Sequence, residues 1–163
     1  MDGYDRKILR ELRRNGRITN QELSERINLS PSPCLRRVRA MEESGVIAGY
    51  TTIIDQSKLG KSVTLFVRVK LERHNRTGVA EFERGVQNSE NVLACYLISG
   101  EYDYLLHIIM DNLESYEEFV RTELHNLAGV SGIDSGFAYG CIKQPTGVYV
   151  SGDLQPRTMR KAP

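Results

Sequence analysis

The 163-residue chain has few cysteines and no long apolar run, the features that mark disulfide-rich secreted proteins and membrane proteins. It has no tryptophan and only three cysteines, Cys34, Cys95 and Cys141, which stand far apart. Three scattered cysteines exclude a disulfide framework, and none belongs to a Cys-x-x-Cys pair. No stretch approaches the ~20 apolar residues of a membrane span, and the first five residues are charged rather than signal-like. We therefore expect a cytoplasmic protein without a membrane partner.

Sequence motifs of catalysis are missing as well. The chain has no phosphate-binding glycine loop, no Gly-x-Ser-x-Gly motif and no carboxylate pair whose spacing would bring the two groups together. Its three histidines, His74, His107 and His125, are isolated and lack the partners that a metal site needs. We expect no enzymatic activity, no catalytic residue, no metal and no cofactor.

Charge is unevenly distributed along the chain. Residues 1–50 hold ten Arg and Lys against seven Asp and Glu, whereas residues 62–150 hold seven against twelve. A DNA partner needs cationic groups that displace counterions from phosphate, and only the first half and the end of the chain supply them. Two small domains fit the length, and association between copies would add buried area to their modest cores.

Residues 18–45 form the most informative segment, because they predict two short helices joined by a tight turn. The first helix opens with Thr19-x-x-Glu22, a capping box. The second begins at Ser30-Pro31 or at Ser32-Pro33, either of which sets a hydroxyl at the N-cap and proline at the first helical position. Gly45 ends it. This arrangement is typical of a helix-turn-helix motif, whose second helix enters the major groove of DNA.

The second of these helices has two distinct faces. At 100° per residue, Cys34, Val38 and Met41 form a buried stripe, and arginines lie on the opposite side. A solvated basic face would explain the arginines alone, but the helix-turn-helix spacing favours DNA, with Arg36 as the best candidate for a base contact. The predicted DNA-binding residues are Ser30, Ser32, Pro33, Arg36, Arg37, Arg39 and Ala40.

The rest of the N-terminal half completes a small domain. Residues 5–14 predict a first helix that closes a three-helix core. Residues 46–55 place a glycine turn among β-branched and aromatic residues and predict a short hairpin, the wing. We assign residues 1–50 to a helix-turn-helix domain and residues 51–61 to a wing strand and linker.

The second half predicts the order β-α-β-β-α-β of a ferredoxin-like sandwich, with both helices on one sheet face and the other face free to pack on a second copy. We assign it to residues 62–145, followed by a polar, basic tail at 146–163, so that the fold class is α+β. The expected elements are strand 63–71, helix 77–88, strands 92–99 and 102–110, a helix from 112 that Gly129 closes, and strand 133–142.

Four segments together resemble the Lrp/AsnC family of feast/famine transcription regulators. They are Asp5-Arg6-Lys7-Ile8-Leu9, Leu29-Ser30-Pro31-Ser32-Pro33-Cys34-Leu35-Arg36-Arg37-Val38, Gly45-Val46-Ile47-x-Gly49-Tyr50 and Gly100-x-x-Asp103-Tyr104-Leu105-Leu106. The resemblance spans residues 4–143. It implies a winged helix-turn-helix domain that binds near-palindromic promoter DNA. It also implies a C-terminal RAM domain that dimerises through its sheet, assembles into tetramers or octamers and senses a small amino acid.

The loop around Gly100 and Asp103 allows two interpretations. Asp103 offers an acceptor for an ammonium group, and Gly100 lets backbone N–H groups approach a carboxylate. An ordinary hairpin turn would use the same two residue types. The resemblance implies the effector site, at the contact between dimers. The predicted effector-binding residues are Ile98, Gly100, Tyr102, Asp103, Tyr104, Asp134 and Ser135. The last two, on the last strand, and Gln87, at a helix end, are the weaker candidates.

Two alternatives remain open. Sirohaem decarboxylases resemble the AsnC family in fold and act on a tetrapyrrole, but they have no need of an arginine-rich second helix. A stand-alone amino-acid-binding module with a vestigial DNA domain is disfavoured by the intact capping box and basic face. The chain departs from the family pattern after Lys143, where Gln144-Pro145-Thr146-Gly147 replaces paired threonines and a proline.

Overall fold

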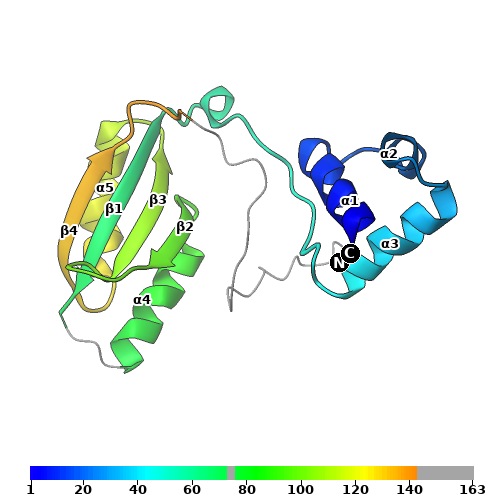
Figure 1. Ribbon diagram of the computed structural model, residues 1–163. Helices are drawn as coiled ribbons and strands as arrows, with labels where there is room; N and C mark the ends of the chain where they lie inside the picture. The colour runs from blue at the N-terminus through cyan, green and yellow to red at the C-terminus, as the bar shows by residue number, and fades with distance from the viewer. Residues whose placement is uncertain (73–75, 143–163) are drawn as a thin grey trace, which may run out of the picture. The chain divides into compact units, whose positions relative to one another are not determined.

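The computed structural model describes residues 1–72 and 76–142 and divides into two compact units. The described part of the N-terminal unit covers residues 1–53, and the C-terminal unit covers residues 54–142 (Figure 1). The predicted tail at 146–163 and the departure after Lys143 lie outside the described residues. Within the described ranges, no helix has the length and apolar character needed to span a membrane.

Three helices form the N-terminal unit, and each begins at a residue that suits a helix start. They are α1 (Gly3–Arg14), α2 (Asn20–Ile27) and α3 (Pro31–Glu43). The predicted capping box of α2 is confirmed, because the Glu22 N–H donates to Thr19 Oγ1 at 3.2 Å and the Thr19 N–H donates to Glu22 Oε2 at 3.1 Å. Asn28 then ends α2 with φ of 55°, a left-handed conformation that asparagine tolerates.

Each of the three helices contributes to one small core. Its buried side chains include Ile8 from α1, Leu23 and Ile27 from α2, and Cys34 and Met41 from α3. The stripe predicted for α3 is thus confirmed, with Val38 packed at its edge. Burial also raises the pKa of the Cys34 thiol, which keeps it protonated and unreactive.

The hairpin predicted at residues 46–55 is wrong. The structure places no strand there, and the segment is linked to α3 by hydrogen bonds from the Ile47 N–H to the Met41 carbonyl and from the Tyr50 hydroxyl to Glu42 Oε1. An isolated two-stranded hairpin is marginal without a surface to pack on. Ile47 packs against the helical core, but Ile53 is 85% exposed, so the second half of the segment has no such surface among the described residues.

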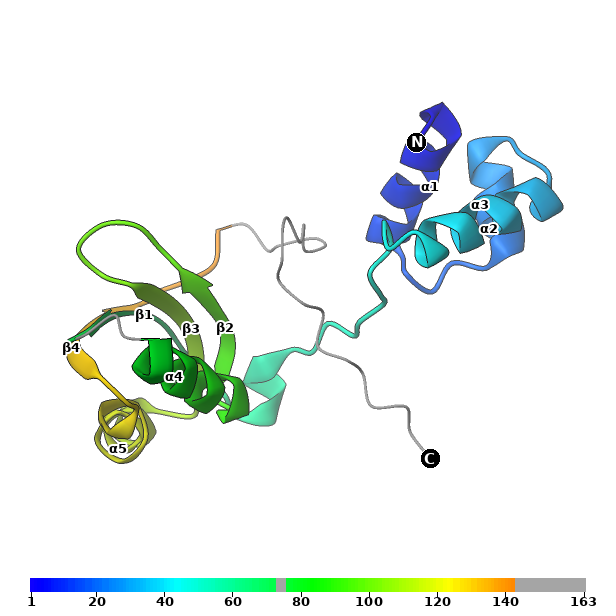
Figure 2. The same ribbon diagram turned by 90° about the horizontal axis from the view of Figure 1, so that it is seen from below.

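The C-terminal unit has the predicted ferredoxin-like order. Its four antiparallel strands lie in the order β2-β3-β1-β4, and α4 and α5 cover one face of the sheet (Figure 2). A short 3₁₀ helix, Gln56–Leu59, precedes the sheet, and a second one, Leu124–Asn126, follows α5. The elements are β1 (Val63–Leu71), α4 (Arg76–Asn88), β2 (Val92–Leu97), β3 (Tyr104–Met110), α5 (Leu113–Thr122) and β4 (Val130–Phe137).

The bounds of the last strand differ from the prediction of 133–142. Strand β4 pairs with β1 from Val130 opposite Leu71 to Phe137 opposite Leu65. Its length is therefore limited by β1, whose first residue is Val63. Tyr139 and Ile142, which made the sequence read as a longer strand, are fully exposed beyond the end of the partner strand.

Side chains alternate between the two faces of the sheet. On β1, Leu65, Val67 and Val69 are fully buried toward the helices, whereas Phe66 and Arg68 lie on the open face. Phe66 stacks there on His107 of β3, with ring centroids 4.8 Å apart. The core on the helix side is completed by Leu106 and Ile108 of β3, Phe82 and Val86 of α4, and Tyr116 and Phe119 of α5.

Replacing Thr19 by alanine should destabilise the N-terminal unit by about 1 kcal/mol, because the capping box loses its hydroxyl and the Glu22 N–H loses its acceptor. Urea unfolding followed by circular dichroism measures this change. Thr51→Ala, in an exposed segment without regular structure, is the matched control. Equal effects of the two substitutions would contradict the role of the cap.

Candidate DNA-binding helix and effector loop

Helix α3 presents a polar, basic face to solvent. Ser32, Arg36, Arg39 and Ala40 are all exposed, and their spacing of three and four residues places them on one side of the helix. Among the described residues, Arg36 and Arg39 form no ion pair. Two guanidinium groups on one helix face are therefore available to a phosphate or to a base edge.

The start of α3 is settled at Ser30-Pro31, with Ser30 at the N-cap and Pro31 at the first helical position. The side chain of Ser30 makes no capping hydrogen bond, contrary to the expectation from its residue type. A capping oxygen accepts from the second or third helical N–H, and the third position here is Pro33, which has none. The turn is held instead by Asn20 of α2, whose Nδ2 donates to the Pro31 carbonyl at 2.9 Å.

Arg37 differs from its arginine neighbours because its guanidinium is already paired. Its Nη1 lies 2.7 Å from Asp2 Oδ2 and 2.8 Å from Asp5 Oδ1, both at the start of α1. Its Cζ also lies 5.5 Å from the centre of the Tyr4 ring. Backbone N–H groups, and then Arg37, lower the pKa values of Asp2 and Asp5, so both are ionised at neutral pH. The sequence pattern had grouped Arg37 with the DNA-binding residues.

The predicted effector loop is fastened to β1 through Asp103. Its Oδ2 accepts from the Leu71 N–H at 2.8 Å, and its own N–H donates to the Val69 carbonyl at 2.9 Å. Its carbonyl accepts from the Ile98 N–H at 2.9 Å, which closes the loop. Gly100 has φ of 124°, a conformation that other residues rarely adopt. Asp103 therefore has a structural role in the turn besides any role toward a ligand.

The other predicted effector residues lie on different faces of the sheet. Tyr104 is 3% exposed in the core on the helix side, where its hydroxyl donates to Glu83 at 2.9 Å, and burial raises its pKa. Ser135 is also on the helix side, hydrogen-bonded to the Tyr116 hydroxyl. Asp134 lies on the opposite face. The structure thus separates Asp134 from Ser135, because successive strand residues point to opposite faces.

Arg68 is a residue that sequence reasoning missed. It pairs with Asp134, directly opposite on β4, and its Cζ lies 5.2 Å from the centre of the Tyr102 ring. It therefore joins two of the predicted effector residues on the open face of the sheet. The alternation of β1 indicates that Arg68 is exposed, but the partnership depends on the register between β1 and β4, which no local pattern fixes.

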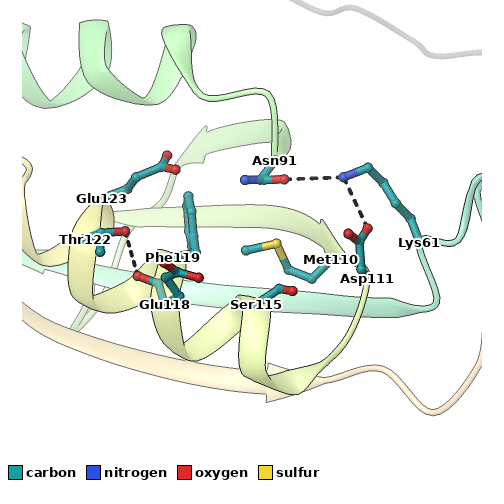
Figure 3. Close-up of a pocket in the computed structure, with 9 residues that line it drawn as sticks. All are labelled: Lys61, Asn91, Met110, Asp111, Ser115, Glu118, Phe119, Thr122 and Glu123. Atoms are coloured by element: carbon teal, nitrogen blue, oxygen red, sulfur yellow. Dashed lines mark hydrogen bonds and ion pairs between the residues drawn. The ribbon is translucent and has the colours of Figure 1, made fainter.

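Two hollows lie on the surface of the described part of the C-terminal unit. One, of about 290 Å³, lies at the far end of β3 from the loop, and Lys61 there reaches both Asn91 (3.4 Å) and Asp111 (3.7 Å) (Figure 3). The other, of about 410 Å³, lies between α5 and β4. Ser135 lines the second hollow, and the other six predicted effector residues line neither.

Comparison with known families agrees with both units. Residues 1–48 match the model of a winged helix-turn-helix DNA-binding domain, and residues 64–148 match the Lrp/AsnC ligand-binding domain. The chain belongs to the Lrp/AsnC family. It is a DNA-binding transcriptional regulator with the ligand-binding domain of that family, and the winged helix-turn-helix and ferredoxin-like predictions are confirmed at the level of domains.

Several relatives support this assignment. The leucine-responsive regulatory proteins of Escherichia coli K12 and of Salmonella typhimurium are each 40% identical over 131 residues, which is 80% of either chain. A transcriptional regulator from Neisseria meningitidis, solved with L-methionine, is 36% identical with a TM-score of 0.85, covering 88% of this chain and 93% of its own. An AsnC family regulator from Agrobacterium tumefaciens is 32% identical with a TM-score of 0.86, covering 91% and 97%.

Substitution of Asp103 by alanine should destabilise the C-terminal unit by about 1–3 kcal/mol, because the buried Leu71 N–H loses its acceptor. Asp103→Asn should cost less than half as much, since the asparagine Oδ1 can still accept. Chemical denaturation of the two variants tests this difference. If both variants unfold at the same denaturant concentration as the unaltered protein, the carboxylate does not hold the turn.

Proposed function

We propose that this regulator binds near-palindromic promoter DNA as a homo-oligomer and that a small amino acid alters its DNA occupancy. The observation that carries the DNA part is the exposed face of α3, on which Arg36 and Arg39 are free of ion pairs among the described residues. A two-fold dimer would place two such helices in successive major grooves. In this arrangement Arg36 reads a base edge, and Ser32 and Ala40 are small enough to allow close approach.

The open face of the sheet supports association of copies. Phe66 is 44% exposed and Tyr96 is 48% exposed on this face, and Leu105 and His107 lie between them. An apolar patch of this kind on a small domain is expected to pack against a partner. We infer a dimer built on this face, which assembles further into tetramers or octamers as the family resemblance implies.

The effector we propose is a small amino acid bound at the loop of residues 98–104. Support comes from the ligand-binding domain match and from the methionine complex of the Neisseria meningitidis relative. Neither of the two hollows described above brings the predicted residues together, since Ser135 alone of them lines one. We therefore place the site where the loops of two copies meet, with Gly100 and Asp103 toward the backbone atoms of the ligand.

Two observations favour this function over tetrapyrrole decarboxylation: α3 carries exposed arginines, and its domain matches a DNA-binding model. Among the described residues we find no feature that supports the decarboxylase alternative. Measured absorption by a bound tetrapyrrole would reopen that alternative.

Replacing Arg36 by glutamine should weaken binding to the promoter upstream of the protein's own gene by about 1–3 kcal/mol if Arg36 reads a base. Binding to random duplex of the same length should weaken much less. Gel shifts or fluorescence anisotropy with both duplexes measure the difference. Equal losses on the two duplexes would remove Arg36 from base recognition and leave it as a phosphate contact.

One of the twenty amino acids at low millimolar concentration should shift the promoter binding curve, and Asp103→Asn should abolish that shift while DNA binding without ligand stays the same. Asparagine keeps the hydrogen bond to Leu71 but removes the charge that faces an ammonium group. Glu101→Gln, an exposed change in the same loop, is the control. A full response in the Asp103→Asn protein would rule out this loop as the ammonium site.

A further inference from the structure

Arg37 sits next to the proposed base-reading residue on α3, yet its charge is already balanced within the protein. One guanidinium nitrogen contacts two carboxylates, at 2.7 Å from Asp2 and at 2.8 Å from Asp5. The side chain of Arg37 is 32% exposed, so it remains close enough to the surface to meet DNA if it were released. No such partner restrains Arg36 or Arg39 among the described residues.

We propose that Asp2 and Asp5 hold Arg37 away from the phosphate backbone and thereby set the ratio of specific to non-specific DNA affinity. This inference rests on the proposed role of α3 in DNA binding. We call Asp2, Asp5 and Arg37 the N-terminal clamp. Arg37 is then a positioning residue that joins α3 to the start of α1, and the DNA contacts of the helix come from its neighbours.

The carboxylates of the clamp are fixed in position by the cap of α1. Asp2 uses Oδ1 to accept from the N–H groups of Tyr4 (2.8 Å) and Asp5 (3.0 Å), which leaves Oδ2 for Arg37. Asp5 uses Oδ2 to accept from the Asp2 N–H at 2.7 Å, which leaves Oδ1 for Arg37. Each carboxylate therefore binds the helix start with one oxygen and the arginine with the other.

This division of oxygens makes the clamp resistant to exchange with DNA. A phosphate could replace one loosely held carboxylate, but here it would have to displace two that are oriented before Arg37 arrives. The Tyr4 ring gives the guanidinium a further attractive contact within the protein, since Arg37 Cζ lies 5.5 Å from the ring centre.

The consequence for DNA binding follows from counterion release. Each cation that neutralises a phosphate adds about 0.9 to the slope of log affinity against log salt concentration, whatever the DNA sequence. An arginine neutralised by its own protein adds nothing to this slope. The clamp therefore removes one sequence-independent phosphate contact from the binding free energy. Contacts that depend on the base sequence then account for a larger share of the total DNA affinity.

The test measures this salt slope for the full chain on promoter and random duplexes. Arg37→Gln should leave the slope unchanged, whereas Arg39→Gln, at the other unpaired arginine on the exposed face of α3, should reduce it by up to about 0.9. The double change Asp2→Asn with Asp5→Asn should steepen the slope by about 0.9, because Arg37 is released. The same double variant should bind random duplex more tightly than before, so that the specific-to-random ratio falls. Asparagine keeps one side-chain oxygen for each cap.

The loss of two negative charges would by itself strengthen DNA binding. A matched variant separates this general charge effect from the release of Arg37. Glu42→Gln with Glu43→Gln removes two carboxylates at the end of α3 without releasing an arginine. Thermal unfolding of every variant confirms that the helices are intact, and Arg37→Gln should lower the midpoint because two carboxylates lose their partner.

Two results would overturn the clamp. One is a reduction of the slope in Arg37→Gln as large as that in Arg39→Gln, which would show that Arg37 reaches a phosphate. The other is an identical effect of the Asp2/Asp5 and Glu42/Glu43 double changes. If the unaltered protein binds no duplex at low salt, the proposed function fails and this inference fails with it, a result that cannot be mistaken for either of the first two.

Discussion

The C-terminal unit depends on the central position of β1, which pairs with β3 on one side and with β4 on the other. Because its side chains alternate, the same strand supplies the core beneath the helices and the open face above them. Leu65, Val67 and Val69 serve the first face, and Phe66 and Arg68 serve the second. The length of β1 also decides where β4 ends. The loop in which we propose the effector site is hydrogen-bonded through Asp103 to Leu71, the last residue of this strand.

In the N-terminal unit, ion pairing decides which arginines are available to DNA. Periodicity places Arg36, Arg37 and Arg39 on or beside one face of α3 and does not distinguish among them. The structure does, because the start of α1 supplies two carboxylates to Arg37 alone of the three. Carboxylates at least 32 residues away in the sequence thus distinguish Arg37 from the neighbouring arginines of α3.

Much of the fold could be predicted from the sequence, because local residue patterns indicate most of the helices and strands. The capping box at Thr19, the stripe of Cys34 and Met41, and the bounds of β1 are of this kind. The predictions were wrong where the local structure depends on a contact with a second helix or strand. Residues 46–55 have strand composition, but no strand among the described residues pairs with them, and Pro33 removes the third helical N–H that Ser30 would cap. The pairing of Arg68 with Asp134 needs a strand register that the sequence does not display.

The scattering of the effector candidates has a consequence for regulation. Tyr104 and Ser135 lie on the helix side of the sheet and Asp134 on the open side. Under the effector site that we propose, a ligand therefore draws its contacts from more than one copy. A ligand that needs two copies to complete its site binds the assembled state better than the separate one. By linkage it must then favour assembly by the same free energy, and a ligand with equal affinity for both states would shift nothing. The direction of the response on DNA follows from which assembly presents its α3 helices at the spacing of the promoter.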